Sequence, residues 1–314
     1  MMNTFITGLI LVAPVPVSYI VEAFRTEPTK PAYTSWEPHL NYQYIKVDGN
    51  QIRYIKYGSG PAVVLLHTLR TQLDMWQKVI PELAKTFTVY AMDHIGHGFS
   101  DIPNIEFMPE TFKRNVAGFM QAMDINNATI VGESIGGSIG LILAAESNKR
   151  VSKVIAINPY GYAQGKGIHR SSMIARLLFS ISNIPILGAT FWRLRSYPIF
   201  LQIMRGGVFN NKSLPKKLMH EINAAGNRKG HHQAFMNLIK HFPKWQQVRE
   251  IYPNIKTPVL LVYGSNDWST ADEREQEYSL IPDSELVIIQ NAGHFISLDS
   301  PDLIELIKHF VSGD

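Results

Sequence analysis

Cysteine is absent from the 314 residues of this sequence. Its absence excludes a disulfide framework, a cysteine nucleophile and a thiolate metal site. It leaves the cellular compartment open, because reducing and oxidising compartments both contain proteins without cysteine. A chain of this length with 45% hydrophobic residues can bury one large core. We therefore expect one main domain with an insertion rather than several independent domains.

Acidic residues are nearly absent from residues 161–250, which contain fourteen lysines and arginines but only Glu221 and Glu250 as acids. This segment carries a net charge of +12, whereas the rest of the chain carries −8. Such an asymmetry predicts contact with something anionic, either an acidic protein or an anionic membrane surface. The alternative is that these basic residues face solvent and bind no partner. Nucleic acid is not expected as a partner, because no nucleic-acid-binding motif accompanies the charge.

Charge is also lacking at the N-terminus, where residues 5–21 form an almost wholly apolar run of 17 residues. This length is at the lower limit for a membrane-spanning helix. We expect residues 1–25 to form a membrane anchor or an interfacial helix, and a helix lying on the protein itself is the alternative. Because Arg25 and Lys30 follow the run, the folded domain is predicted on the cytoplasmic side. Export by a cleaved signal peptide is less favoured, since no basic residue precedes the run.

Beyond a proline-rich linker at residues 26–38, short apolar runs alternate with stretches of helical periodicity. The strand candidates are a hairpin at 42–47 and 51–57, then 62–67, 87–93, 128–131, 154–158, 258–263 and 285–289, and the helix candidates are 75–84, 109–123, 135–145 and 302–310. This alternation predicts an α/β fold with a mostly parallel central sheet and helices on both faces. Residues 39–160 and 251–314 would form this core, and the basic residues 161–250, which show helical periodicity and no clear strand, would form a helical lid.

The most informative motif lies at residues 132–136, which read Gly-Glu-Ser-Ile-Gly between an apolar strand and a helix. A nucleophile at a sharp strand-to-helix turn crowds the residues two before and two after it, and Gly132 and Gly136 lack the Cβ atoms that would clash. The helix that begins at Ile135 directs free N–H groups towards this turn. The motif therefore predicts that Ser134 is a nucleophile.

A serine hydroxyl is a weak nucleophile at neutral pH, so Ser134 requires a histidine base and an acid that orients this base. With such an elbow, the three residues follow the order serine, acid, histidine, each on a loop after a strand. Asp267 follows the apolar run 258–263, and His294 follows the run 285–289. We therefore predict a catalytic triad of Ser134, Asp267 and His294.

From about residue 42 to the C-terminus, the sequence resembles the α/β-hydrolase superfamily, in its lid-bearing serine esterase and lipase branch. Besides the elbow and the two triad loops, residues 65–67 (Leu-Leu-His) resemble the strand that ends in the family's His-Gly oxyanion loop, and residues 93–100 resemble its Asp-x-x-Gly-x-Gly-x-Ser turn. Thr68 departs from the usual glycine of the oxyanion loop. The resemblance implies an oxyanion hole formed by the backbone N–H groups of Leu69 and Ile135.

The resemblance implies hydrolysis of a carboxylic ester through an acyl-enzyme. Relatives that open halogenated alkanes or epoxides have an aspartate at the position of Ser134, so both reactions are disfavoured. The apolar side chains of residues 161–250 favour an acyl or other apolar substrate, for example a lipid. The chain is also similar to carrier-protein methyl esterases, whose basic lids hold an acidic carrier protein. This resemblance implies that the substrate could be bound to a carrier protein. An acyltransferase, a carbon–carbon bond hydrolase and a non-catalytic ligand receptor remain alternatives.

No cofactor and no metal ion are expected. His94 and His97 lie in a loop without a third ligand and without the helical spacing of a zinc site, and His231 and His232 are expected to be inert.

Overall fold

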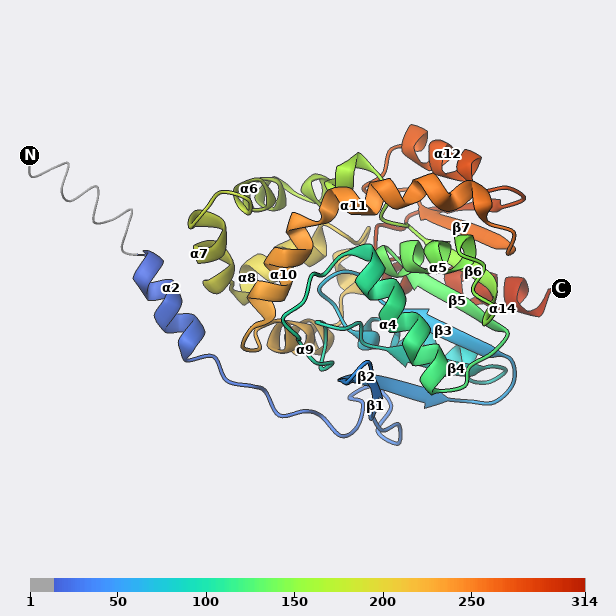
Figure 1. The fold of residues 1–314 in the computed structure, drawn as a ribbon, viewed down its shortest axis with the longest axis horizontal. Helices are drawn as coiled ribbons and strands as arrows, with labels where there is room; N and C mark the ends of the chain where they lie inside the picture. Colours follow the sequence, from blue (N-terminus) through green and yellow to red (C-terminus); the bar gives the residue numbers. More distant parts are fainter. Residues whose placement is uncertain (1–13, 314) are drawn as a thin grey trace, which may run out of the picture.

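The computed structural model describes residues 14–313, and within them one sheet of eight strands forms the centre of the molecule (Figure 1). The strands, in sheet order, are β1 (Gln43–Val47), β2 (Asn50–Tyr57), β4 (Thr88–Met92), β3 (Ala62–Leu66), β5 (Ala128–Glu133), β6 (Val151–Ile157), β7 (Val259–Gly264) and β8 (Glu285–Ile289). β1 and β2 form an antiparallel hairpin, and β2 also pairs antiparallel with β4. All other neighbours are parallel, so the carboxyl ends of β5, β7 and β8 lie at one edge of the sheet.

Helices cover both faces of this sheet. Their bounds are α3 (Ile80–Leu83), α4 (Pro109–Ala122), α5 (Ile135–Ala145), α12 (Ala271–Leu280), α13 (Ile296–Asp299) and α14 (Asp302–Ser312). Alternate residues of β3 point to opposite faces, so that Val64 and Leu66 pack with α4 and α5, whereas Val63 and Leu65 pack with α3 and α14. Both faces of β3, β5 and β7 are therefore buried, which explains why these strands appear in the sequence as continuous apolar runs.

The predicted fold class is confirmed, because the sheet is mostly parallel and carries helices on both faces. One predicted element is wrong. Residues 75–84 do not form a single helix but a 3-10 turn, Leu73–Trp76, followed by the four-residue α3. Pro81 is the reason, since proline has no N–H and is tolerated only in the first turn of a helix, so that a new helix must begin just before it.

Between β6 and β7 the chain forms a helical insertion, residues 161–250, in which the structure contains no strand. Its main helices are α6 (Met173–Ile181), α7 (Leu187–Arg193), α8 (Tyr197–Arg205), α9 (Lys216–Gly226), α10 (His231–Lys240) and α11 (Phe242–Gln247). Aromatic rings form its interior, with the ring centroids of Trp192 and Phe235 4.6 Å apart and those of Phe179 and Trp192 5.6 Å apart. Most of the apolar residues of the insertion therefore pack against one another.

Not all the basic residues of the insertion face solvent. Arg195, Arg228 and Arg249 are buried, and Arg170 pairs with Glu273 of α12 with 2.6 Å between the closest atoms. The surface charge of the insertion is therefore smaller than its composition suggests. Exposed lysines on α9, α10 and α11 retain a basic surface, and its binding of an anionic partner stays a prediction.

The N-terminal prediction requires a correction. The structure places α2 (Pro14–Ala23) beside α7, at the end of the molecule far from α14 (Figure 1). Glu22 of this helix accepts a hydrogen bond from Arg195 Nη1 at 2.9 Å, and Arg25 donates one to the carbonyl of Arg193 at 2.8 Å. No helix within residues 14–313 is long and apolar enough to cross a membrane, so the predicted membrane anchor is wrong, and the orientation inferred from it loses its basis. Residues 1–13 of the predicted segment lie outside the described residues.

Candidate active site

Ser134 occupies a strained turn between β5, which ends at Glu133, and α5, which begins at Ile135. Its backbone has φ 59° and ψ −118°, a conformation that costs a residue with a side chain about 1–3 kcal/mol. The flanking glycines are required. A Cβ on Gly132 would lie 2.2 Å from the carbonyl of Gly136, and a Cβ on Gly136 would lie 2.3 Å from the carbonyl oxygen of Leu66.

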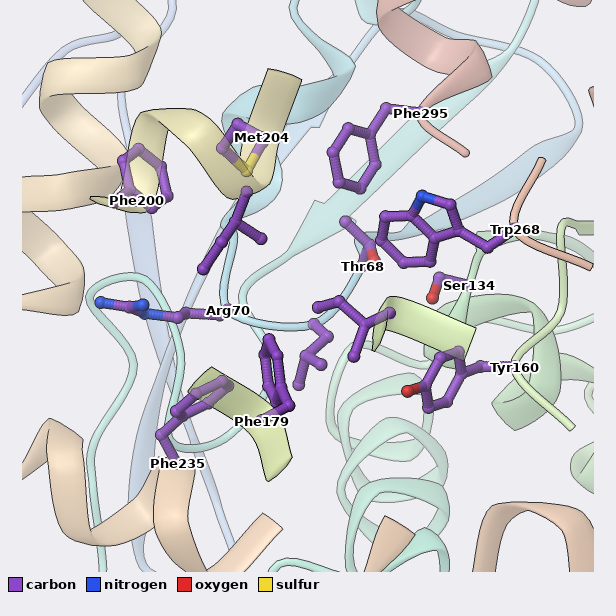
Figure 2. Close-up of a pocket in the computed structure, with 13 residues that line it drawn as sticks. Thr68, Arg70, Ser134, Tyr160, Phe179, Phe200, Met204, Phe235, Trp268 and Phe295 are labelled. Carbon is purple, nitrogen blue, oxygen red and sulfur yellow. The ribbon is translucent and has the colours of Figure 1, made fainter. Parts of the chain in front are cut away.

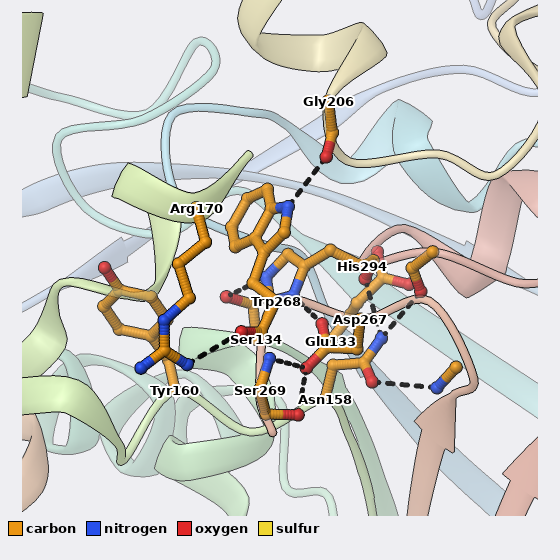
Figure 3. A network of polar contacts seen from close by, with 12 residues as sticks. Glu133, Ser134, Asn158, Tyr160, Arg170, Gly206, Asp267, Trp268, Ser269 and His294 are labelled. Atoms are coloured by element: carbon orange, nitrogen blue, oxygen red, sulfur yellow. Dashed lines mark hydrogen bonds and ion pairs between the residues drawn. The ribbon is translucent and has the colours of Figure 1, made fainter. Parts of the chain in front are cut away.

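Three side chains predicted from the sequence form one chain of hydrogen bonds (Figure 3). His294 Nε2 lies 2.9 Å from Ser134 Oγ, and His294 Nδ1 lies 2.5 Å from Asp267 Oδ1. Because a carboxylate can only accept, the histidine proton lies on Nδ1, and Nε2 is left to accept the serine proton. The structure therefore brings together Ser134, His294 and Asp267, which are separated by up to 160 positions in the sequence.

The surroundings of Asp267 keep its carboxylate ionised. Burial raises the pKa of Asp267, but the charge of His294, together with hydrogen bonds from His294 and Ser269, outweighs burial and brings the pKa below its ordinary value of 3.8. Both the backbone N–H and the hydroxyl of Ser269 donate to the second carboxylate oxygen. A fixed negative charge at this position would stabilise a protonated His294.

Trp268 is a site residue that the sequence analysis did not identify. Its indole ring stacks on the imidazole of His294, with centroids 3.7 Å apart and an angle of 12° between the planes. Its Nε1 donates to the carbonyl of Gly206 at 2.7 Å, which joins the active-site loop to the helical insertion. The stack covers one face of the imidazole and thereby restricts the rotation of His294.

Asn158, directly after β6, holds the loop that carries His294 in place. Its Nδ2 donates to the carbonyls of Gly293 at 3.1 Å and His294 at 2.9 Å, while its Oδ1 accepts from Gly264 N–H at 3.0 Å. One buried amide thus connects the ends of β6 and β7 with the loop that carries His294 (Figure 3). The sequence marked this residue only as the end of a strand.

Glu133, the variable residue of the elbow, makes a similar connection. Its two carboxyl oxygens accept hydrogen bonds from the backbone N–H and the hydroxyl of Ser297, both at 3.0 Å. Burial raises the pKa of Glu133 to about 8, so that its carboxyl group is protonated at neutral pH. Glu133 is therefore a neutral link between the nucleophile turn and the segment after His294.

The loop after β3 supplies one of the two predicted oxyanion donors. His67 anchors this loop, since its Nδ1 donates to the Thr68 carbonyl at 2.7 Å and its Nε2 accepts from the His94 N–H at 3.0 Å. The backbone N–H groups of Leu69 and Ile135 donate to no other atom within residues 14–313. Both are therefore free to bind a ligand, although Thr68 replaces the glycine expected in the loop.

The other histidines singled out in the sequence lie in packed surroundings. Burial lowers the pKa of His94, and that of His97 to about 4, so both rings are neutral at pH 7. His231 is also buried, and His232 pairs with Glu22 of α2. Among residues 14–313, no group of three or more histidine, aspartate or glutamate side chains is placed to hold a metal ion.

A small cavity lies beside Ser134 (Figure 2). Four polar residues reach it, namely Thr68, Arg70, Ser134 and Tyr160. The rest of its wall is apolar and aromatic, and includes Ile168, Phe179, Phe200, Ile203, Met204, Phe235, Trp268 and Phe295. The insertion supplies one side of this wall and the core supplies the other, so that the predicted nucleophile faces an apolar space with few polar groups.

Comparison with known proteins agrees with this geometry. The family model for the alpha/beta hydrolase fold matches residues 61–301. A 2-hydroxy-6-oxo-6-(2'-aminophenyl)hexa-2,4-dienoic acid hydrolase of Metapseudomonas resinovorans is 24% identical over 265 residues, which cover 83% of this chain and 87% of that protein.

Among solved structures, the enol-lactonase of Burkholderia xenovorans LB400 superposes with a TM-score of 0.70 at 22% identity, over 86% of this chain and all of the other. A bacterial membrane phospholipase A gives a TM-score of 0.73 at 21% identity, over 99% of this chain and 96% of the other. At these identities the two structures show a shared fold. The family model covers more than half of the chain, and this protein therefore belongs to the α/β-hydrolase family and is a hydrolase.

Proposed function

We propose that this protein is a serine esterase that cleaves a carboxylic ester through an acyl-enzyme. The observation that carries the proposal is the chain of contacts from Asp267 through His294 to Ser134, with 2.9 Å between His294 Nε2 and Ser134 Oγ at the edge of an apolar cavity. A nucleophile, a base and an orienting acid in this geometry are the groups that acyl transfer requires.

In the proposed reaction, Ser134 Oγ attacks the ester carbonyl while His294 Nε2 takes the hydroxyl proton. The backbone N–H groups of Leu69 and Ile135 stabilise the oxyanion, and one such donor is worth about 3 kcal/mol in known cases. The tetrahedral intermediate collapses, His294 returns the proton to the departing alcohol, and the acyl group remains on Ser134. Water, deprotonated by His294, then attacks the acyl-enzyme and releases the acid.

The cavity wall supports an apolar substrate. Its aromatic and aliphatic side chains offer no hydrogen bonds over most of their surface, so a hydrocarbon chain gains about 0.8 kcal/mol for each methylene group it buries there. The phospholipase and the lactonase with the same fold are named for reactions at esters, which agrees with the proposal.

Two measurements test the role of Ser134. A fluorophosphonate probe should label the wild-type protein on Ser134 and should fail to label Ser134→Ala. p-Nitrophenyl esters of increasing chain length should be hydrolysed with a burst of one p-nitrophenolate per active site. Ser279→Ala, which removes an exposed serine of α12, is the control and should behave as wild type. Labelling that persists in Ser134→Ala would contradict the proposal.

Carbon–carbon bond hydrolysis is a second candidate, favoured by the dienoic acid hydrolase that matches over most of both chains. The same nucleophile and base can act on a ketone carbonyl, with a carbon leaving group in place of an alcohol. Turnover of a 2-hydroxy-6-oxo-dienoic acid, followed by the loss of its visible absorbance, would support this candidate if simple esters are poor substrates. The absence of such turnover beside rapid ester hydrolysis would reject it.

A further inference from the structure

Arg70 extends from the oxyanion loop of the core into the helical insertion. Its backbone has a positive φ of 55°, which is uncommon for a residue with a side chain. The guanidinium carbon lies 5.3 Å from the ring centroid of Trp192, 5.8 Å from that of Phe200 and 5.2 Å from that of Phe235. These rings belong to α7, α8 and α10. Arg70 also lines the cavity that contains Ser134, and its guanidinium points away from Ser134 (Figure 2).

The guanidinium has no polar partner in the described part of the chain. Within residues 14–313 it donates no hydrogen bond and forms no ion pair, whereas buried Arg53 binds two aspartates and buried Arg195 binds Glu22. The charges that act on Arg70 come from Arg195 and Arg25, which are both cations. No carboxylate of the insertion or of α2 therefore compensates Arg70.

Arg70 is only partly buried, but the charges nearest to it are repulsive. Burial, followed by the charges of Arg195 and Arg25, lowers the pKa of Arg70 to about 9, so the side chain is still charged at neutral pH. Aromatic faces attract a cation but accept none of the five N–H donors of a guanidinium. A cation with unused donors beside an apolar cavity can bind an anion, because hydrogen bonds between a guanidinium and a carboxylate are stronger than those between neutral groups.

We infer that Arg70 binds a carboxylate at the far end of the substrate, so that the preferred substrates are esters whose chain ends in a free carboxylate. This inference rests on the proposed function, since it places the ester at Ser134 and the carboxylate at Arg70 in one cavity. A carboxylate fits a single guanidinium in charge and in planar, two-pronged geometry. A phosphate monoester carries nearly two negative charges, and the one cation would leave much of this charge uncompensated.

A role in packing alone is the competing explanation, because the same aromatic contacts could hold the insertion against the core. The two explanations predict different kinetics. Loss of a packing contact would impair every substrate alike, whereas loss of a carboxylate site would impair only substrates that carry the carboxylate.

The first experiment compares mono-p-nitrophenyl esters of adipic to sebacic acid with p-nitrophenyl esters of monocarboxylic acids that have the same number of carbons. Wild type should prefer the acidic ester at least tenfold in kcat/KM at one chain length, mainly through a lower KM. Arg70→Gln should lower kcat/KM for that ester about a hundredfold and leave the neutral ester within about threefold. Arg70→Lys should restore part of the preference, and Arg205→Gln, at an exposed arginine of α8, should have no effect. Equal losses for both esters in Arg70→Gln, or no preference at any length, would overturn the inference.

The second experiment separates the inference from the proposed function, because it needs no turnover. In the Ser134→Ala protein, monomethyl adipate and its longer homologues should raise the thermal unfolding temperature, whereas the dimethyl esters should not. Adding Arg70→Gln should abolish the effect. If the half-esters bind in this way but no ester is hydrolysed by wild type, the inference holds and the proposed function fails. If the half-esters have no effect, or an effect independent of Arg70, the inference fails whatever the activity.

Discussion

The buried carboxyl group of Glu133 should make the folded protein less stable as the pH rises. Burial raises its pKa from 4.5 to about 8, and its two oxygens form hydrogen bonds with Ser297. Between these two pH values the unfolded chain has lost the proton while the folded protein retains it. Unfolding then releases a proton and is favoured by rising pH, so this group lowers the free energy of unfolding by about 5 kcal/mol in all between pH 4.5 and 8.

Glutamine at position 133 would imitate the protonated carboxyl group without titrating. Its carbonyl oxygen can accept from the Ser297 N–H, and its amide can donate to the Ser297 hydroxyl, so both connections are retained. We therefore expect Glu133→Gln to match wild type in stability near pH 5 and to exceed it by several kcal/mol at pH 8 to 9. Activity at pH 7 should change less than about threefold, because Glu133 does not contact Ser134 Oγ or His294.

Urea unfolding at several pH values between 5 and 9 measures this difference. Glu275→Gln, which removes an exposed carboxylate of α12, is the matched control and should stay within about 0.5 kcal/mol of wild type throughout. Curves of wild type and Glu133→Gln that run parallel over this pH range would show that Glu133 is ionised in the folded protein and would refute the reasoning.

Four further predictions follow from the active site and the surface. Asp267→Asn should lower kcat about 10⁴-fold, equal to about 5 kcal/mol, because an amide favours the wrong tautomer of His294; steady-state kinetics beside an unchanged circular dichroism spectrum would check this. Trp268→Phe keeps a ring on His294 but loses the hydrogen bond to the insertion, so kcat should fall less than tenfold and the free energy of unfolding by about 1 kcal/mol. Gly136→Ala forces a Cβ against the carbonyl of Leu66 and should cost at least about 2 kcal/mol in urea unfolding. If the exposed lysines of the insertion bind an acidic carrier protein, kcat/KM for a carrier-bound ester should fall steeply between low and high salt, whereas a p-nitrophenyl ester should respond little.

Elements with a strong local pattern could be predicted from the sequence. Helix α5 and strand β8 have the bounds that were predicted, because the elbow glycines mark the start of one and a short apolar run defines the other. Helix α12 was missed, although Thr270 and Glu273 form a capping box that the sequence could have suggested. It has no apolar stripe, so hydrophobic periodicity could not reveal it.

The prediction of a membrane anchor at the N-terminus was wrong for a different physical reason. A run of apolar residues has the same composition whether it crosses a membrane or packs on a protein surface, and the choice depends on what the neighbouring polar groups contact. In the structure, Glu22 and Arg25 contact the insertion through Arg195 and Arg193, and these contacts join residues about 170 positions apart. Sequence periodicity contains no information on such pairs.

The candidate site also contains residues that the sequence could predict and residues that it could not. The chain order of serine, acid and histidine indicated three side chains that the structure brings into hydrogen-bond contact, and their catalytic roles are part of the proposed function. Trp268 and Asn158 were missed, because a ring stack and a hydrogen bond to a distant loop appear only after folding. No sequence motif marks Arg70 as a binding residue. Its candidacy rests on its lack of a polar partner within residues 14–313, in contrast to Arg53 and Arg195.

The central claim is that Ser134 carries the acyl group during turnover, and trapping this intermediate tests it most directly. Wild-type protein mixed with a p-nitrophenyl ester and quenched in acid within milliseconds should gain the mass of one acyl group, and peptide mapping should locate it on Ser134. His294→Ala should form this adduct far more slowly. Turnover at full rate with no acyl adduct, or with the adduct on another residue, would contradict the account.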